Sequence, residues 1–454
     1  MMRAPSLLMY SKLMSKDRES EPLCYENDMK KMPCRKDSGY DSISSPIEMP
    51  YPLTSLDVLQ EAKAVLRYSI PLAITFFLGY STRATDVWFL GKLGPQAMAV
   101  SSLGHLFITV TGISIGNGIL TAIDTLVAQA FTGAKHHHTV GIILQRGLLV
   151  SFIFGIMISV LWANSEFILV LMGQDPMLAN MAQTYIIILI PYLFICYANT
   201  ALRKFLQSIG KWLYWPGLTL NAFGGWSEFL RLGIPGMLSL STDWAFEVCA
   251  LLTGVLGQTS LAAQSVVLTI NTLLLMIPTA LSTGMAVRLG HLLGANEPRK
   301  SNLCFMVSAG IGVLCTFINA LAIFTYRSQI AHHFSSDSEV VEATINLLQV
   351  ASACHFTMGI GIVFSYALNA LGKQTIVASL NVVSYYMIGL PFGIYLTYQC
   401  DWGLEGIWAG VALSGIVKVL CEFSILTYLV DWRHECQLAT NRIHDQEYAT
   451  SFIV

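Results

Sequence analysis

Charged residues are scarce in this sequence. Asp, Glu, Lys and Arg make up 12% of its 454 residues, whereas 54% of the residues are hydrophobic. Soluble domains carry about twice this share of charge, so the composition excludes an ordinary soluble domain and indicates a membrane protein. The net charge of −2 and the lack of a basic cluster give no sign of a nucleic-acid partner.

The motifs of ATP-driven transport and of zinc metalloproteases are missing as well. No P-loop and no His-Glu-x-x-His occurs in the chain. Its 10 cysteines are scattered, most of them within apolar runs or near the N-terminus, which predicts free thiols rather than a disulfide framework. We expect neither an enzyme nor a bound cofactor or metal.

Apolar runs long enough to cross a bilayer recur along the chain. A membrane-spanning helix needs about 20 apolar residues, and only helices or closed barrels satisfy their backbone groups in lipid. We therefore predict an all-α polytopic membrane protein with about ten transmembrane helices, at residues 66–90, 101–128, 140–162, 179–202, 229–252, 261–283, 302–325, 342–369, 376–399 and 404–429. Lys and Arg gather in the loops on one side, which places both termini in the cytosol.

The chain also repeats itself at an offset of about 160 residues. Residues 66–71 match residues 230–235, and Gly133 matches Gly294. Two homologous helical bundles in parallel orientation are a recurrent plan of secondary transporters. The predicted segments are a disordered cytosolic tail (1–60), a first transmembrane lobe of only four helices (61–215), a linker (216–225), a second lobe of six helices (226–432) and a cytosolic tail (433–454).

Two carboxylates stand inside one apolar run. Asp243 and Glu247 are four residues apart and therefore share a helix face. An acid within a membrane span is costly unless it is protonated, paired or hydrated, so the pair indicates an ion-coupling site with Glu247 as the principal proton carrier. An acid of ordinary exposure at a span end is the alternative. Trp244 and Phe246 either offer aromatic faces to an organic cation or pack against lipid.

Isolated amides mark other apolar runs. Gln264 and Asn271 lie seven residues apart and share a helix face. Asn117 is an isolated amide in an earlier apolar run. They are candidates for lining a substrate cavity, although amides in membranes also join helices by hydrogen bonds. Pro71 and Pro235 occupy equivalent positions of the repeat and predict matching bends in the first helix of each lobe.

Several motifs together resemble one transporter family. They include Gly118-Ile-Leu-Thr-Ala-Ile-Asp-Thr-Leu-Val-Ala-Gln-Ala, Phe229-Leu-Arg-Leu-Gly-Ile-Pro-Gly-Met-Leu and Gly389-Leu-Pro-Phe-Gly. Over about residues 60–432 the chain is similar to the eukaryotic branch of the multidrug and toxic compound extrusion (MATE) family. The resemblance implies two six-helix lobes that export organic cations or amphipathic compounds, driven by inward H⁺ or Na⁺.

The resemblance also assigns roles and shows departures. Asp86 is similar to an acid that binds the coupling ion in prokaryotic members, although Arg83, one turn away, could instead form a structural ion pair with it. Asp124 belongs to a motif that closes the inner side of the first lobe, which favours a gating or structural role. The family has twelve core helices, and two of the first lobe are missing here. Met358 stands where the family usually has an acid.

These observations predict a secondary antiporter for small organic, cationic or amphipathic substrates, with H⁺ or Na⁺ as the transported ion. We expect a monomer in the lipid bilayer of the plasma or vacuolar membrane. The alternative is a transport-deficient truncated isoform or gene model of such a transporter. A receptor or membrane enzyme is not supported, because the number of spans does not fit a receptor and no catalytic cluster is present.

Overall fold

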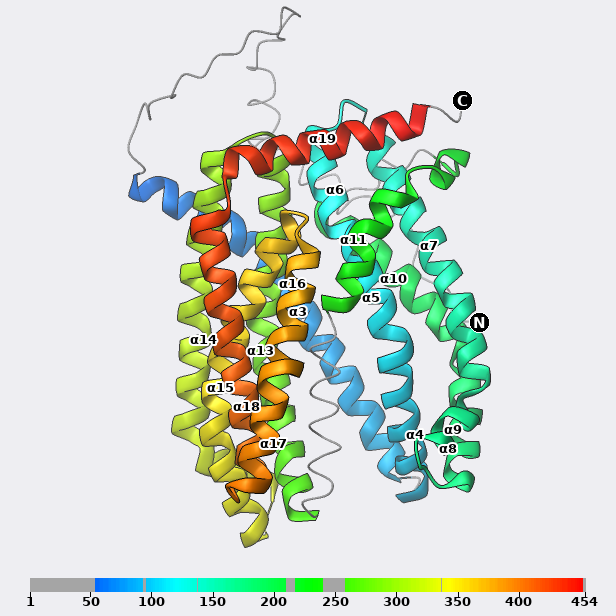
Figure 1. Ribbon diagram of the computed structural model, residues 1–454, viewed down its shortest axis with the longest axis vertical. Coiled ribbons are helices and arrows are strands. Elements are labelled where there is room, and N and C mark those ends of the chain that lie inside the picture. Colours follow the sequence, from blue (N-terminus) through cyan, green and yellow to red (C-terminus); the bar gives the residue numbers. More distant parts are fainter. Residues whose placement is uncertain are drawn as a thin grey trace, which may run out of the picture. The chain divides into compact units, whose positions relative to one another are not determined.

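The computed structural model describes residues 54–92, 95–136, 138–209, 217–239, 258–335 and 337–451, and most of them are helical (Figure 1). The first half contains α3 (Ser55–Lys92), α4 (Pro95–Ile108), α5 (Ser114–Ile119), α6 (Thr121–Gly133), α7 (His138–Ala163), α8 (Ser165–Leu171), α9 (Pro176–Ile188) and α10 (Ile190–Ile209). The second half contains α11 (Trp226–Ser239), α13 (Gln258–Gly294), α14 (Pro298–Phe334), α15 (Ser338–Ala370), α16 (Gln374–Asn381), α17 (Leu390–Gln399), α18 (Gly403–Ser424) and α19 (Trp432–Ser451). Short turns of other helix types are η1 (Thr109–Ile113), η3 (Leu220–Phe223), η4 (Val382–Gly389) and η5 (Ile425–Leu429).

Within the described residues, 8 helical segments are long and apolar enough to cross a membrane. A ninth results if α9 and α10, which are bent by 48° at a short break, form one span. The prediction of an all-α polytopic membrane protein is confirmed. The predicted span at 229–252 begins in α11, and its remaining residues, 240–252, lie outside the described ranges.

Helix α3 begins earlier than the sequence indicates. We expect a tail up to residue 60, but the helix starts at Ser55, where Thr54 and Asp57 cap each other. The Thr54 N–H donates to Asp57 Oδ2 over 2.9 Å, and the Asp57 N–H donates to Thr54 Oγ1 over 3.3 Å. The helix extends before the predicted boundary at 61 because apolar content defined that boundary, whereas the first turns of α3 are polar. Residues 1–53 lie outside the described residues.

The first helix of each half packs against the second helix of the other half. Helix α3 lies along α13, and α11 lies along α5 and α6. Glycines permit both approaches, because Gly284 of α13 faces Ser69 of α3, and Gly118 of α5 faces the backbone of Met237 of α11. This reciprocal packing is the arrangement expected of two units related by an axis along the membrane normal.

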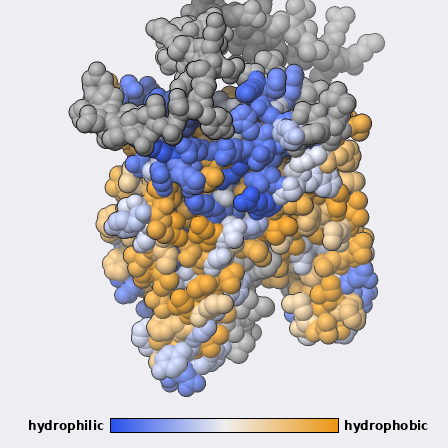
Figure 2. All heavy atoms as spheres, turned by 45° about the horizontal axis from the view of Figure 1, so that its top comes forward, coloured by the Kyte–Doolittle hydropathy of each residue, from blue (hydrophilic) through white to orange (hydrophobic). Residues whose placement is uncertain are grey.

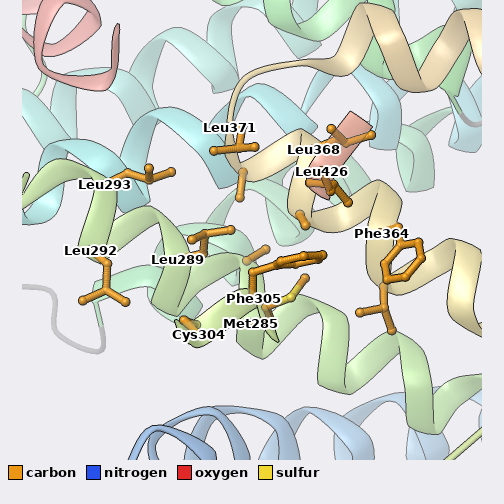
Figure 3. Packing of buried hydrophobic residues seen from close by; sticks show 14 of the residues in the cluster. Met285, Leu289, Leu292, Leu293, Cys304, Phe305, Phe364, Leu368, Leu371 and Leu426 are labelled. Carbon is orange, nitrogen blue, oxygen red and sulfur yellow. The ribbon is translucent and has the colours of Figure 1, made fainter. Parts of the chain in front are cut away.

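The largest core cluster of the described residues lies mostly in the second half, with Val65 of α3 as its member from the first half. It joins α13, α14, α15 and η5, and Figure 3 shows Met285, Phe305, Leu368 and Leu426 among its members. Lipid tails are as apolar as these side chains. Close packing, rather than the exclusion of water, therefore stabilises this core.

The C-terminal segment forms a helix that composition does not predict. We expect only a tail after residue 432, but α19 lies across the ends of α6, α13 and α14 (red in Figure 1). Cys436 of α19 is buried in the core described above, and Ile443 lies against Gly133 of α6. Hydrophilic residues gather at this end of the bundle and hydrophobic residues cover the flanks (Figure 2). We call it the α19 end.

Cys436 allows a test of this packing. Burial raises the pKa of its thiol to about 11, so the thiol stays protonated until the pH approaches that value. Because the thiolate is the reactive form, we expect Cys436 to resist iodoacetamide in the native protein at neutral pH while the exposed Cys400 reacts. Peptide mass spectrometry measures both, and unfolding in SDS is the control that should make Cys436 reactive. Equal labelling of both thiols in the native protein would show that α19 does not pack on the bundle.

The linker between the halves is held at the same end. Gln145 of α7 donates from Nε2 to the carbonyl oxygen of Gly217 over 2.5 Å. The neighbouring Arg146 is fully buried and donates to the carbonyl oxygen of Asn221 over 3.4 Å and to Gln446 Oε1 of α19. Side chains of α7 and α19 therefore hold the described part of the connection between the two halves.

Candidate functional site

The structure places only part of the predicted site. Four of its residues lie outside the described ranges, namely Asp243, Trp244, Phe246 and Glu247. Asp86 and Arg83 belong to α3, but their side chains are not among those described. Asn117 is half-buried on α5, and the two repeat-equivalent prolines, Pro71 and Pro235, lie inside α3 and α11. The roles assigned to all of these residues stay predictions.

The predicted cavity residue Asn271 meets a histidine that sequence reasoning missed. His355 of α15 is fully buried, and its Nδ1 lies 2.8 Å from Asn271 Oδ1 of α13. An amide oxygen only accepts hydrogen bonds, so Nδ1 carries the proton and donates it. His355 Nε2 then presents an acceptor lone pair, and it has no hydrogen-bond partner among the described residues. The pair therefore offers one open polar atom deep in an apolar bundle.

Further polar side chains surround this pair. Asn271 Nδ2 lies 3.8 Å from Met358 Sδ, and Asn319 of α14 donates from Nδ2 to the carbonyl oxygen of Leu274 over 3.2 Å. Gln264 is buried about two turns before Asn271 on α13. Helices α13, α14 and α15 thus enclose amide and imidazole groups that can orient a polar ligand.

Two helices from different halves cross closely at the α19 end. Gly133 ends α6 and Gly294 ends α13, and a Cβ atom on Gly133 would lie 2.7 Å from the Gly294 carbonyl oxygen. One turn earlier, a Cβ on Gly290 would lie 2.5 Å from the Cβ of Ala128. Gly133 and Gly294 are equivalent in the sequence repeat, so the two halves meet at matching positions.

Hydrogen bonds reinforce this crossing. Helix α15 ends at Ala370, so its last carbonyl groups have no partner within the helix. Thr125 of α6 donates from Oγ1 to the Asn369 carbonyl oxygen over 2.7 Å, and Gln129 of α6 donates from Nε2 to that of Ala370 over 2.9 Å. The structure therefore has the two halves joined at the α19 end.

Asp124 lies close to this crossing but pairs within its own half. Lys204 of α10 forms an ion pair with Asp124 Oδ2 of α6, and both side chains are largely buried. The pair ties α6 to α10 one turn before Gln129. This position is compatible with the expected gating or structural role, which stays a prediction.

A family model described as MatE matches residues 71–221 and 236–395, well over half of the chain. The chain belongs to the MATE family. The resemblance drawn from its motifs is thus confirmed, and the chain is an integral, multi-pass transporter of the multidrug and toxin extrusion kind rather than an enzyme.

Similar proteins occur in fungi, animals and plants. An uncharacterised transporter of Schizosaccharomyces pombe is 30% identical over 446 aligned positions, which cover 85% of this chain and 83% of the relative. Human multidrug and toxin extrusion protein 1 is 28% identical over 439 positions, covering 84% of this chain and 77% of the relative. The crystal structure of the eukaryotic MATE transporter AtDTX14 has a TM-score of 0.79 at 23% identity, over 85% of this chain and 100% of that chain.

The fungal alignment contains a gap on the side of this MATE chain. It runs over 446 positions although it covers only 85% of 454 residues, so the relative has residues with no counterpart here. A gap of this kind is what the short first lobe leads us to expect. Its position stays a prediction.

Three ionisable residues inside the spans escaped the sequence reasoning: His355, Lys418 and Glu422. Each stands in an apolar run, at 342–369 or 404–429, and is buried in the structure. An ionisable side chain in a membrane span is by itself a reason to suspect function. The sequence alone therefore contains a signal for all three residues.

Proposed function

We propose that this MATE chain is a secondary antiporter that exports organic cations or amphipathic compounds in exchange for H⁺ or Na⁺. The observation that carries the proposal is the buried pair of Asn271 and His355, with its open Nε2 atom, inside the apolar spans of a MATE-family chain. Polar groups at membrane depth mark the paths of substrates or ions. The names of relatives, such as multidrug and toxin extrusion protein 1 in human, support drug-like substrates.

The contact between the halves suggests how exchange proceeds. Lys135 and Lys373 contact residues of α19, and Lys300 lies in the first turn of α14, which packs against α19. An excess of lysine is typical of the cytosolic side. Both termini would then lie in the cytosol, at the plasma or vacuolar membrane. Substrate entering from the cytosol needs the α6–α13 crossing to open, and release on the far side needs it to close again.

Transport by the purified chain tests the proposal. In proteoliposomes with an acidic lumen, we expect external ethidium, an organic cation, to accumulate as protons leave. We expect His355→Leu to reduce this uptake by about tenfold or more, because the buried hydrogen bond and the open acceptor are lost. Ser424→Ala, on the exposed side of α18, is the control and should transport like the wild type. A folded wild-type protein that moves no dye under an H⁺ or a Na⁺ gradient would contradict the proposal.

The short first half supports a second candidate function. A chain that lacks two helices of one lobe would be a transport-deficient isoform that associates with a complete relative, or an incomplete gene model. The genomic sequence between codons 216 and 226 discriminates these cases. An in-frame segment that encodes two apolar spans would favour the isoform or the gene model, and its absence would favour a transporter built with four helices in one half.

A further inference from the structure

A carboxylate in the second half has no part in the function proposed so far. Glu422 of α18 is fully buried, about 10 Å along the helix axis from the end of the span at Leu429. Helices α15 and α18 run side by side in the same direction, from a contact between Cys354 and Trp408 to a contact between Ser365 and Glu422. Glu422 therefore lies at membrane depth, between two helices of one half.

The partners of this carboxylate leave one oxygen open. Ser365 Oγ donates to Glu422 Oε1 over 2.7 Å, and Lys418 Nζ lies 3.9 Å from the same oxygen. Oε2 has no hydrogen-bond partner among the described residues. Charge-assisted hydrogen bonds are about 2.7–2.9 Å long, so Lys418 neutralises Glu422 by charge without binding it directly. A buried carboxylate with a loose counter-ion and an open oxygen is poorly stabilised in its ionised form.

Small residues let α15 and α18 approach each other closely beside the lysine. Gly361 of α15 faces the stem of Lys418, since a Cβ atom there would lie 4.0 Å from both Cδ and Cε of the lysine. Gly415 lies against Thr357 in the same interface. The interface between α15 and α18 therefore combines close helix packing with the polar groups of Lys418 and Glu422.

The described elements that pack around Glu422 offer its carboxylate no charged partner other than Lys418. The remaining elements that pack against α18, which are α16, η4, α17 and η5, contain tyrosines but no Asp, Glu, His, Lys or Arg. On α15 the carboxylates are Glu339 and Glu342 at the far end, and His355 is bonded to Asn271 about 15 Å along the helix from Ser365. The other titratable side chains of α15, Cys354 and Tyr366, are uncharged at neutral pH. Lys418 is thus the charged group that faces Glu422 within the described residues.

We propose that Glu422, Lys418 and Ser365 form a proton-binding site inside the second half, a site that rests on the antiport function proposed above. On one side of the membrane a hydronium ion gives its proton to Glu422 Oε2, a new O–H bond forms and one water molecule leaves. On the other side water takes the proton back. Lys418 keeps its charge throughout, so the site changes from neutral to a net charge of +1 and disfavours an organic cation bound in the same half. By reciprocity, a bound cation disfavours the proton.

The same geometry selects H⁺ over Na⁺. A metal cation requires several oxygen ligands, and this site offers one carboxylate and one serine hydroxyl. The Lys418 ammonium group 3.9 Å from the carboxylate would also repel a second cation. A proton needs only the lone pair of Oε2.

Transport by full-length variants tests the site. In Glu422→Gln the amide keeps the shape and can still accept from Ser365, but it cannot bind a proton. We expect proton-driven ethidium uptake to fall by about tenfold or more, while exchange of ethidium without a pH gradient stays close to that of the wild type and loses its pH dependence. Glu405→Gln, in the first turn of the same helix, is the matched control and should keep all three properties. Uptake and pH dependence at wild-type levels in Glu422→Gln, or uptake that follows a Na⁺ gradient alone, would overturn the proposal.

Infrared difference spectroscopy of the purified chain provides a readout that does not need transport. Between alkaline and acidic buffer we expect a carboxylic-acid C=O band that is absent in Glu422→Gln and shifted in Lys418→Met. If the wild type transports nothing but this band is present, the antiport function fails and the site stands. If Glu422→Gln leaves the spectrum unchanged, the site fails whatever the transport result.

Discussion

Replacing Gly294 by alanine is expected to reduce transport by about tenfold or more while the chain stays folded. A Cβ atom at this position would overlap the Gln129 carbonyl oxygen of α6 and lie 2.6 Å from Thr132 Oγ1. Overpacking of this kind costs about 1–3 kcal/mol. The cost falls only on the state in which the two halves touch at the α19 end, and it therefore shifts the balance between closed and open states by about 5–150-fold.

Gly310→Ala is the matched control for this substitution. Gly310 lies on α14, where an added Cβ would meet nothing within 4 Å. Ethidium uptake measures function, and protease cleavage of the α6–α7 loop reports whether the α19 end has opened. Wild-type uptake in Gly294→Ala would mean that the α6–α13 crossing does not form in the working transporter.

Replacing Glu61 by alanine is expected to destabilise the protein by about 3–5 kcal/mol. The Glu61 carboxylate accepts two hydrogen bonds from the Arg288 guanidinium group, over 2.8 Å at Nε and 3.0 Å at Nη2. This bidentate pair is largely buried and joins α3 to α13, that is, one half to the other. Loss of the carboxylate would leave the guanidinium charge of Arg288 without the partner that compensates its burial.

Lys300→Ala is the control for this second experiment. Lys300 and Glu297 form an ion pair on the surface, with 59% of the lysine side chain exposed. Exposed ion pairs contribute about 0–1 kcal/mol to the free energy of unfolding, so we expect Lys300→Ala to change the stability little. Thermal unfolding in detergent, followed by tryptophan fluorescence, compares the variants. Equal melting temperatures for Glu61→Ala and the wild type would refute a stabilising role for the pair.

Much of the membrane architecture follows from the sequence. Apolar runs predict the long helices because lipid demands both apolar side chains and internally bonded backbone. Periodicity also places Gln264 and Asn271 together on the buried side of α13. The family motifs lead to the correct family, since they combine glycines, prolines and polar residues at fixed spacings.

Other features depend on contacts between distant segments, which a single sequence does not show. Helix α19 is polar by composition, and it is ordered by Cys436 in a core built from α13, α14 and α15. The site at Glu422 needs α15 and α18 side by side. His355 becomes a candidate site residue only through its contact with Asn271, which lies on another helix.

The glycine crossing lies at the tip of a long helix, so a small tilt of that helix is enough to open it. Helix α13 has 37 residues and is about 55 Å long, and Gly294 is its last residue. A tilt of about 15° about the middle of the helix, a familiar size for rigid-body rotation, would move Gly294 by about 7 Å and the Gln258 end by the same distance in the opposite direction. Fluorescent or spin labels near Gly133 and Gly294 would therefore report the opening of the crossing as an increase in distance, and labels near the middle of α13 would move least.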